Sequence, residues 1–490
     1  MNNDMSNCEV ITLYTSESCN LSCVYCGMAQ QINVKRHACE AKKAKESLAN
    51  GEYYNTLIHA FDRLKIDKNR INRIDLWGQE PTLTLLEFNQ FFPEFYKLCP
   101  NTKTIMFSTN GVAFADRIIA FVKMLKETVK NNLFTFELQF SYDGYKNTKE
   151  KRGADPERIK NNVKTFLTEL NNIELPDTFN IQINFHNVID DSIINLYADD
   201  KNADELKMYI EELIELENEF MNLNTNPQVD VSNFSPGIIS PLNASVQDGK
   251  NLVKFFNNCE KIGEHCDNKF WRGLAHLSVL GPIRFDYETD GKKLIKSLLS
   301  GNLREEEISR LSSMCGCGYG YGALKIRYDG TLAHCQNGAL MGLTDEELDG
   351  QDGLVYEVQK AKIKHGFYPN VFSSSDEELD RYLYLSYLNS RDSFPHLFLQ
   401  SLNLMIMLLS VHQIDQSYND VDKLLRHAYY MAFVGSCPHN NMTETGSVVG
   451  RSVGWFRFLC NGFLDICEEY LPIWRERDRE AREHECNFRR

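Results

Sequence analysis

Short runs of β-type residues alternate with amphipathic stretches through the first half of the chain, and this alternation constrains the fold more than any other feature. The helical patterns include Leu85 to Leu98, Asp116 to Lys130 and Asp155 to Asn171, the last with Asp155 as N-cap. A parallel sheet is expected, because parallel strands need crossover connections. We predict an α/β fold, a partial (β/α)6 TIM-like barrel with ligands at the carboxyl ends of its strands. The expected strands are Val10 to Tyr14, Arg73 to Trp77, Thr104 to Ser108, Phe134 to Ser141, Phe179 to Val188 and Val229 to Ser232.

Three cysteines, Cys19, Cys23 and Cys26, follow the first expected strand. Three thiolates on one short loop can each bind one iron of a cubane cluster and leave the fourth iron without a protein ligand, whereas a closed electron-transfer cluster takes four cysteines. A structural zinc site is the alternative, but it usually takes two cysteine or histidine pairs, and no second pair lies near Cys19 in the sequence. The spacing therefore favours an open [4Fe-4S] cluster.

This spacing, with the aromatic Tyr25 just before the last cysteine, resembles the radical S-adenosylmethionine (radical SAM) superfamily. In that superfamily the open iron chelates the amino and carboxylate groups of SAM. One-electron reduction then cleaves SAM to a 5'-deoxyadenosyl radical. The resemblance thus implies a SAM-binding [4Fe-4S] cluster on Cys19, Cys23 and Cys26, with SAM as the second cofactor.

The turn after the second expected strand, Gly78-Gln79-Glu80-Pro81, resembles the Gly-Gly-Glu-Pro element of the same superfamily. That element holds the amino group of SAM through backbone and carboxylate acceptors, which an ammonium group with three donors requires. Gln79 replaces the second glycine. A site that depends on a positive φ at this position would be strained.

Two further turns resemble elements of the superfamily that place short polar side chains near the ribose and carboxylate of SAM. Asn110 lies in a Thr-Asn-Gly turn after the third strand, and Ser141 begins a Ser-Tyr-Asp-Gly turn after the fourth. Arg152 matches an arginine that clamps the SAM carboxylate in related maturases, a role that suits a planar fork of donors. A solvated surface arginine is the alternative. His186 is expected to be a satisfied residue at a strand end.

A second group of cysteines surrounds a predicted hairpin, in which Lys325 to Tyr328 and Thr331 to His334 are joined by the two-residue turn Asp329-Gly330. The spacing of Gly330 and the following cysteine resembles the SPASM and twitch extensions, which carry auxiliary iron–sulfur clusters in radical SAM maturases. The dense downstream run of four cysteines of a full SPASM extension is absent from the sequence. The resemblance therefore implies one auxiliary [4Fe-4S] cluster, and a zinc site is the alternative. Its expected ligands are Cys315, Cys317, Cys335 and Cys437.

The length of 490 residues indicates two to three domains. We expect the partial barrel at 1–236, a linker with a twitch-like auxiliary-cluster domain at 237–365, and a helical module at 366–490. The resemblance does not cover the helical module. Three roles are open for it: substrate binding, assembly, or a cap over the open side of the barrel. Its expected helices are Asp376 to Leu388, Pro395 to His412, Tyr418 to Val434 and Val453 to Arg482.

Composition narrows the class of protein. A net charge of −15 argues against nucleic acid as a partner, because nucleic-acid binders usually carry basic patches. No secretion signal is recognisable, and the most apolar window, Leu397 to Val411, is short for a bilayer span and suits a buried core helix. Fifteen cysteines in an unsecreted chain indicate metal ligands and reduced thiols. We expect a cytoplasmic protein without a membrane partner.

The resemblance implies an enzyme similar to ribosomal-peptide maturases and sulfatase-maturing enzymes, in which the SAM-derived radical abstracts hydrogen from a substrate carbon. A precursor peptide is the expected substrate, with a low-potential electron donor such as flavodoxin or ferredoxin. Eighteen residues precede Cys19, so we expect no N-terminal peptide-recognition domain. A radical SAM dehydrogenase or rearrangement enzyme for a small metabolite is one alternative. A zinc-binding structural scaffold is the other.

Overall fold

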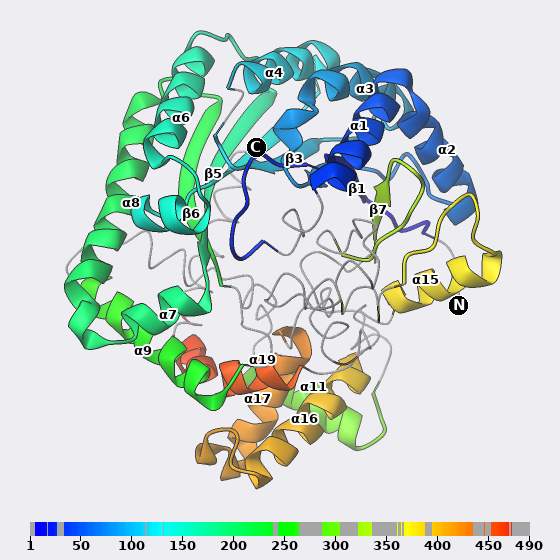
Figure 1. The fold of residues 1–490 in the computed structure, drawn as a ribbon. Helices are drawn as coiled ribbons and strands as arrows, with labels where there is room; N and C mark the ends of the chain where they lie inside the picture. Colours follow the sequence, from blue (N-terminus) through cyan, green and yellow to red (C-terminus); the bar gives the residue numbers. More distant parts are fainter. Residues whose placement is uncertain are drawn as a thin grey trace. The chain divides into compact units, whose positions relative to one another are not determined.

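The chain divides into two compact units in the computed structural model (Figure 1). The first comprises Met1–Val188, Tyr209–Pro236 and Cys317–Leu388, and the second Ile189–Met208, Gly237–Gly316 and Asn389–Arg490. The structure describes residues 5–16, 18–26, 34–112, 115–130, 132–238, 244–263, 287–303, 322–335, 367–387, 394–434 and 452–469, and the single positions 360, 364, 445 and 472. The expected domain boundaries at 236 and 365 stay predictions.

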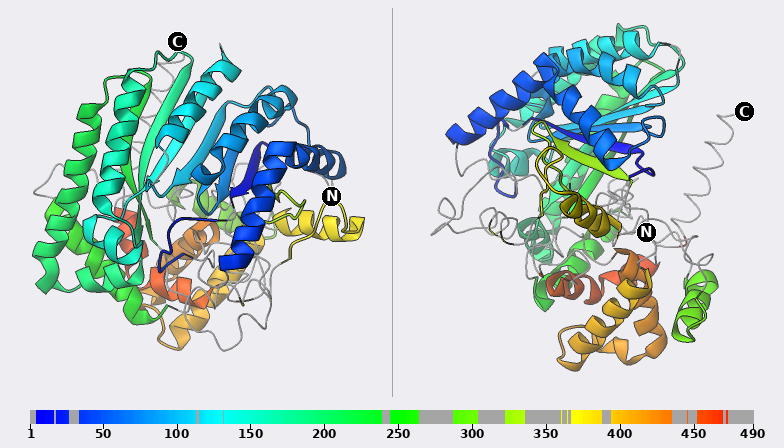
Figure 2. Two further views of the ribbon diagram at one scale, coloured as in Figure 1. Left: turned by 45° about the horizontal axis from the view of Figure 1, so that its top comes forward. Right: turned by 90° about the vertical axis from the view of Figure 1, so that its right-hand side faces the viewer.

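A seven-stranded sheet in the order β6-β5-β4-β3-β2-β1-β7 organises the first unit (Figures 1 and 2). The registered pairs from β5 through β1 to β7 are all parallel. The predicted α/β class is therefore confirmed, and the partial barrel is an open sheet whose two edge strands are β6 and β7. The strands are β1 (Val10–Ser16), β2 (Arg73–Gly78), β3 (Thr104–Thr109), β4 (Phe134–Ser141), β5 (Phe179–Ile189), β6 (Val229–Ile238) and β7 (Ala323–Arg327).

Helices cover one face of this sheet (Figure 1). All six predicted strands are present, and the predicted helix Asp155 to Asn171 begins as expected, because the Asp155 side chain accepts from the Glu157 N–H. The helical elements that lie wholly or mainly in the first unit are α1 (Val34–Asn50), α2 (Glu52–Leu64), the 3-10 turn η1 (Pro81–Leu83), α3 (Leu85–Leu98), α4 (Ala115–Val129), α5 (Tyr145–Lys151), α6 (Pro156–Asn171), α8 (Ala203–Leu223) and α15 (Asp376–Tyr387).

The two faces of the sheet differ in chemistry. On the helix-covered face, the rings of Phe107, Phe121 and Phe136 pack with centroids 5.5–5.8 Å apart, which joins β3 and β4 to α4. On the other face, Arg73 pairs with Glu137 at 2.8 Å and with Asp75 at 2.7 Å. A parallel sheet covered on both faces is usually apolar on both. This second face instead carries half-buried charged side chains that pair with one another.

The hairpin predicted near residue 330 forms, but its first arm is a strand of the main sheet. β7 pairs in parallel with β1, and Ile326 forms an antiparallel bridge with Leu332. The predicted two-residue turn is wrong: the Arg327 N–H donates to the Thr331 carbonyl at 2.9 Å, which leaves three residues in the loop. Gly330 has a φ of 84°, the left-handed conformation that a three-residue hairpin with a bulge requires.

The second unit is helical in its described parts. Gly249 on α9 approaches α19 so closely that a Cβ there would lie 2.7 Å from the Arg457 carbonyl oxygen. The single helix predicted from Val453 to Arg482 is interrupted at Gly462, whose φ is 104°, and a second helical segment covers 463–469. No described helix is long and apolar enough to cross a bilayer. The elements are α7 (Asp191–Tyr197), η2 (Asp200–Asn202), α9 (Val246–Gly263), η3 (Tyr287–Gly291), α11 (Lys292–Leu299), α16 (Phe394–Ser410), η6 (Gln416–Asn419), α17 (Val421–Val434) and α19 (Val453–Cys460).

Candidate functional site

The turn after β2 is tied directly to the chain that leads into the cysteine loop. The Gln79 N–H donates to the Ser16 carbonyl and the Glu80 N–H to the Ser18 carbonyl, both at 3.0 Å. Gly78 has a φ of 119°, and a Cβ on it would lie 2.0 Å from the Ser16 carbonyl oxygen. The backbones of β1 and β2 can therefore meet at this point only because residue 78 is glycine.

The strain considered for Gln79 does not arise. The non-glycine residues with positive φ in the described part of the chain are Lys65, Lys130 and His412. The left-handed conformation of this turn lies at Gly78, the glycine that the sequence retains. Replacement of the second glycine of the motif by Gln79 is thus compatible with an unstrained turn.

Glu80 links the ends of β2 and β3. Its Oε1 accepts from the hydroxyls of Thr82 and Thr109 at 2.6 and 2.8 Å, and its Oε2 accepts from the Asn110 N–H at 2.8 Å. The side chain is 1% exposed, and burial raises the pKa of its carboxyl group above the ordinary value. This carboxylate therefore fixes the geometry of the two turns, and the contact of this turn with the SAM amino group stays a prediction.

Asn110 contacts the cysteine loop itself. Its Nδ2 lies 3.4 Å from the Cys19 sulfur and 2.7 Å from the Asn20 Oδ1, while its Oδ1 accepts from the Val112 N–H at 3.0 Å. The Asn110 amide is thus oriented at both ends. The structure brings this predicted site residue to the first of the three predicted cluster ligands.

The three thiols of the loop are half-exposed, as ligands of an external group need to be. Thiolates about 2.3 Å from a zinc ion lie within about 4 Å of one another. Among the described residues, the one group of three histidine, cysteine or acidic side chains with ligand atoms all within 4.8 Å of one another is His427, Asp465 and Glu468. At least one pair among the sulfurs of Cys19, Cys23 and Cys26 is therefore more than 4.8 Å apart, wider than the ligands of one zinc ion stand. The choice between an iron–sulfur cluster and zinc stays a prediction.

The C-terminal part of the loop is held by backbone and apolar contacts. The Cys26 N–H donates to the Cys23 carbonyl at 3.0 Å, and the Val24 N–H donates to the Lys151 carbonyl at 2.9 Å. Cys26 also packs against a small buried cluster formed by Tyr14 of β1 and Ala333. Burial raises the pKa of the Cys23 thiol to about 12, and the positive charge of Arg152 acts in the opposite direction.

Arg152 and Asp143 form a buried ion pair behind the loop. Arg152 donates through Nε and Nη2 to both Asp143 oxygens, and the Tyr25 hydroxyl donates to Oδ2 of Asp143 at 2.5 Å. Burial alone would lower the pKa of Arg152, but the Asp143 carboxylate holds it above the ordinary value. With Arg152 5% exposed, the alternative of a solvated surface arginine is wrong. Direct contact of Arg152 with SAM stays a prediction.

Sequence reasoning missed Asp143 as a site residue, although it named the turn that contains it. Ser141 ends β4 beside His186 of β5, and the Ser141 hydroxyl makes no hydrogen bond to another described residue. Because Ser141 is half-buried, its hydroxyl is a candidate donor or acceptor for a ligand. His186 accepts through its carbonyl from the Tyr142 N–H at 2.8 Å, and its structural role stays a prediction.

One of the four predicted auxiliary ligands can be placed. Cys335 is 5% exposed, and its carbonyl accepts from the Tyr14 hydroxyl at 2.6 Å. Tyr14 thus contacts the main chain of Cys335 and belongs to the buried cluster against which Cys26 packs. Cys315, Cys317 and Cys437 lie outside the described residues, so the auxiliary cluster stays a prediction.

Several other cysteines are structural thiols. Burial raises the pKa of Cys8, Cys99 and Cys460 to about 12, which leaves these thiols protonated and unreactive at neutral pH. The described cysteines all have free thiols. Cys39, by contrast, is exposed on α1.

Comparisons with known proteins complete the description. No family model and no curated protein matches the chain. Among solved structures, Streptococcus suis SuiB bound to the precursor peptide SuiA has a TM-score of 0.44 at 15% identity, with 91% of this chain and 75% of that chain covered. SuiB bound to S-adenosylmethionine has a TM-score of 0.38 at 16% identity, with 72% and 67% covered. Similarity at this level does not establish a shared function.

Proposed function

We propose that this chain is a radical SAM enzyme that abstracts hydrogen from a ribosomally made peptide. One observation carries the proposal: three half-exposed thiols lie on one short loop that follows β1, at the carboxyl edge of an open parallel sheet. That edge is where parallel α/β folds bind their ligands. Cys19, Cys23 and Cys26 would hold a [4Fe-4S] cluster there.

When bound, the cluster and SAM supply reductive cleavage of SAM to a carbon-centred radical, chemistry that no side chain of this chain provides. The protein positions the reactants. The Gly78 turn fixes the start of the loop through Ser16 and Ser18. The Asp143 carboxylate fixes its end through the Tyr25 hydroxyl. A loop held at both ends keeps its three thiols in place as ligand is bound and released.

Several groups remain to bind SAM. We propose that backbone carbonyls of the Gly78-to-Glu80 turn accept from its amino group and that the Ser141 hydroxyl contacts its polar groups. The Arg152 fork is engaged by Asp143 through Nε and Nη2. We therefore propose that Arg152 acts mainly by placing its positive charge near the SAM carboxylate and by orienting Asp143.

The finer assignments belong to the same proposal. A peptide substrate and one auxiliary [4Fe-4S] cluster rest on the resemblance of the Cys315, Cys317 and Cys335 region to twitch extensions. A flavodoxin or ferredoxin would supply the electron.

Formation of 5'-deoxyadenosine tests the proposal. The anaerobically reconstituted protein should form it from SAM under dithionite, and simultaneous replacement of Cys19, Cys23 and Cys26 by alanine should abolish it. Cys39→Ala is the matched control, because Cys39 is an exposed cysteine outside the loop. Undiminished cleavage in the triple variant, with both proteins folded by circular dichroism, would contradict the proposal. Mass spectrometry of a co-expressed precursor peptide then tests the substrate class.

A further inference from the structure

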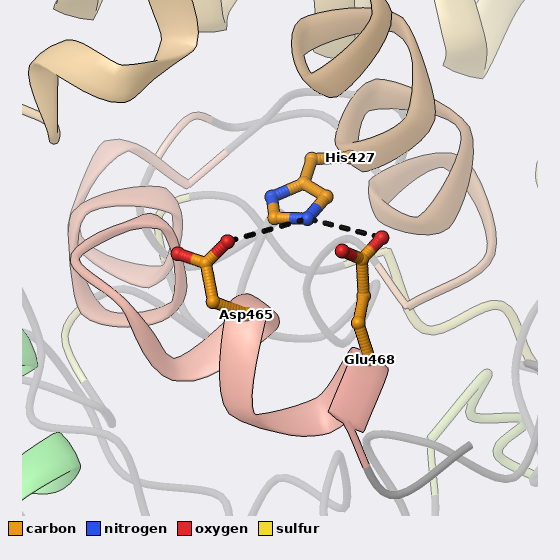
Figure 3. Close-up of side chains that lie close together, drawn as sticks. All are labelled: His427, Asp465 and Glu468. Atoms are coloured by element: carbon orange, nitrogen blue, oxygen red, sulfur yellow. Dashed lines mark ion pairs between the residues drawn. The ribbon is translucent and has the colours of Figure 1, made fainter. Parts of the chain in front are cut away.

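A second group of ligating side chains lies within the helical unit, among residues that the radical chemistry does not use. His427 comes from α17, and Asp465 and Glu468 come from the helical segment 463–469 (Figure 3). Residues three apart on a helix lie on the same face. One ligand atom from each of the three side chains lies within 4.8 Å of the other two.

His427 is the buried centre of this group. Its side chain is fully buried, and its Nδ1 is 2.7 Å from the Tyr418 hydroxyl, which fixes the orientation of the ring. Its Nε2 is buried, has no well-directed hydrogen bond to any described residue, and lies within ion-pair distance of both carboxylates. Figure 3 shows this nitrogen directed between the two carboxylates, 3.3 Å from the Glu468 Oε1 and 3.9 Å from the Asp465 Oδ1. One ring nitrogen and two carboxylates therefore face a common point.

These distances suit a metal ion with tetrahedral coordination. Ligand atoms about 2.0–2.1 Å from zinc stand about 3.3 Å apart in that geometry. The His427 Nε2 to Glu468 Oε1 distance of 3.3 Å already matches. The distance to the Asp465 Oδ1 would have to fall from 3.9 Å to about 3.3 Å, a movement that a carboxylate 38% exposed can make while it keeps its contact with Lys423. That exposure also leaves room for water in a fourth position.

Basic side chains around the group hold the carboxylates in place. Lys423 Nζ lies 2.6 Å from the Asp465 Oδ1, and Arg426 Nε donates to the Glu468 Oε1. In metal sites the ligating carboxylates and the second histidine nitrogen are usually hydrogen-bonded in this way, which orients them toward the ion. Tyr418, Lys423 and Arg426 together provide such a surrounding layer.

We propose that His427, Asp465 and Glu468 bind one divalent transition-metal ion of the Zn²⁺ class, which joins α17 to segment 463–469. One imidazole and two carboxylates are a donor set that suits Zn²⁺ and neighbouring metals more than Ca²⁺ or Mg²⁺, which take oxygen ligands. The site is separate from the cysteine loop and does not depend on the proposed radical chemistry. The alternative is that no metal ion binds and that a protonated His427 forms ion pairs with the two carboxylates.

Zinc content after equilibrium dialysis distinguishes these two alternatives. The full-length protein, Asp465→Asn, Glu468→Gln and the control Asp422→Asn are dialysed against Zn²⁺, freed of loosely bound metal and analysed. Asp422 pairs with the same Arg426 at 3.1 Å but is not one of the three ligands. We expect the Asp465 and Glu468 variants to hold one zinc fewer per chain than the wild type, and Asp422→Asn to hold as many. Zinc bound by cysteines does not affect this comparison, because the wild type and all variants have the same cysteines.

Thermal unfolding gives a second readout. Added Zn²⁺ should raise the melting temperature of the wild type and of Asp422→Asn more than that of Asp465→Asn, because an ion that binds only the folded state stabilises it. Asp465 is partly exposed, so its isosteric replacement should fold, and melting in a chelator checks this. Equal zinc content in all four proteins, with equal temperature shifts, would overturn the metal site and leave the ion pairs of His427.

Discussion

Arg152 holds Asp143 by two parallel hydrogen bonds, from Nε to Oδ2 at 2.7 Å and from Nη2 to Oδ1 at 2.9 Å. Both side chains are almost entirely buried. The same carboxylate accepts from the Val188 N–H at 2.8 Å and from the Tyr25 hydroxyl. A single buried anion thus connects the cysteine loop with the carboxyl ends of β4 and β5. Removal of either charge leaves its partner buried and unpaired.

Arg152→Ala should destabilise the fold. Breaking a buried ion pair by removing one partner costs about 3–5 kcal/mol, because the remaining charge is uncompensated. We therefore expect a loss of that size in the free energy of unfolding, measured by urea titration, together with weaker SAM binding. Arg158→Ala, at an exposed position on α6, is the control and should change stability by less than about 0.5 kcal/mol. A loss below about 1 kcal/mol for Arg152→Ala would show that the Tyr25 hydroxyl and the Val188 N–H stabilise the Asp143 carboxylate without the arginine.

Gly78→Ala should disrupt the junction between β1 and β2. The added Cβ would lie 2.0 Å from the Ser16 carbonyl oxygen, and backbone atoms cannot move away as a flexible side chain can. Gly51→Ala is the matched control: Gly51 also has a positive φ, of 82°, but no atom lies within 4 Å of the added carbon. The control should lose about 1–2 kcal/mol from left-handed strain alone.

The free energies of unfolding of the two glycine variants provide the comparison. Gly78→Ala should lose clearly more than Gly51→Ala, and its reconstituted form should hold less iron, because the displaced Ser16 and Ser18 begin the cysteine loop. Equal losses in the two variants would mean that the close approach of Gly78 to Ser16 contributes nothing beyond its φ.

Strands and helices are encoded by patterns of neighbouring residues, which explains why the sequence predicted them. β4 carries buried residues at every second position, and α3 begins and ends at the residues predicted. The pairing of β7 with β1 is not local: about 310 residues separate the partners, and no pattern within Ala323–Arg327 states which strand it joins. The sequence therefore did not predict that β7 forms an edge of the sheet, parallel to β1.

Burial of charge is the second property that the sequence could not supply. Arg152 and Asp143 are nine residues apart in the sequence. Their residue types do not show whether the two side chains are buried or in contact with water. Backbone conformation at Gly78 and Gln79 was likewise not predictable. The motif shows that Gln79 replaces a glycine, but it does not show that the positive φ lies at Gly78. The three cysteines, whose spacing is visible in the sequence, were predictable as a group. Their anchoring by Asn110, Tyr25 and Ser18 was not.

Glu40 on α1 should stabilise the docking of the β7 hairpin in a pH-dependent manner. Burial acts to raise its pKa, but hydrogen bonds from Tyr328 and Lys43 and the charge of Arg327 lower it below the ordinary value of 4.5. A carboxylate with a lowered pKa in the folded state contributes stability that is present above about pH 4.5 and is lost as the pH falls through the folded pKa.

Unfolding of Glu40→Gln between pH 3 and pH 7 measures this contribution. The variant should be less stable than the wild type by about 1 kcal/mol at neutral pH, since Glu40 is partly exposed, and the difference should shrink in acid. Glu46→Gln on the same helix is the control, because its carboxylate is 59% exposed and contacts Lys42 at 3.6 Å. A difference that does not vary with pH would show that the hairpin docks without the Glu40 charge.

Iron content decides between one cluster and two. A SAM-binding cluster and one auxiliary cluster, both of the four-iron type, predict about eight irons per chain after anaerobic reconstitution. Replacement of Cys19, Cys23 and Cys26 by alanine should leave about four. Adding Cys335→Ala should lower the remainder, and adding the buried Cys99→Ala instead should not.

Cys335 is the best probe of the auxiliary cluster because its main chain is fixed by the Tyr14 hydroxyl whichever late cysteine completes the site. If the triple variant retains no iron, Cys315, Cys317 and Cys335 are structural or bind zinc. If it retains about eight irons, the late cysteines build a second auxiliary cluster and the twitch-like assignment is wrong. If the triple variant retains about four irons and adding Cys335→Ala does not change that number, an auxiliary cluster exists but Cys335 is not one of its ligands. The role of Cys335 is then structural, through the contact of its main chain with Tyr14.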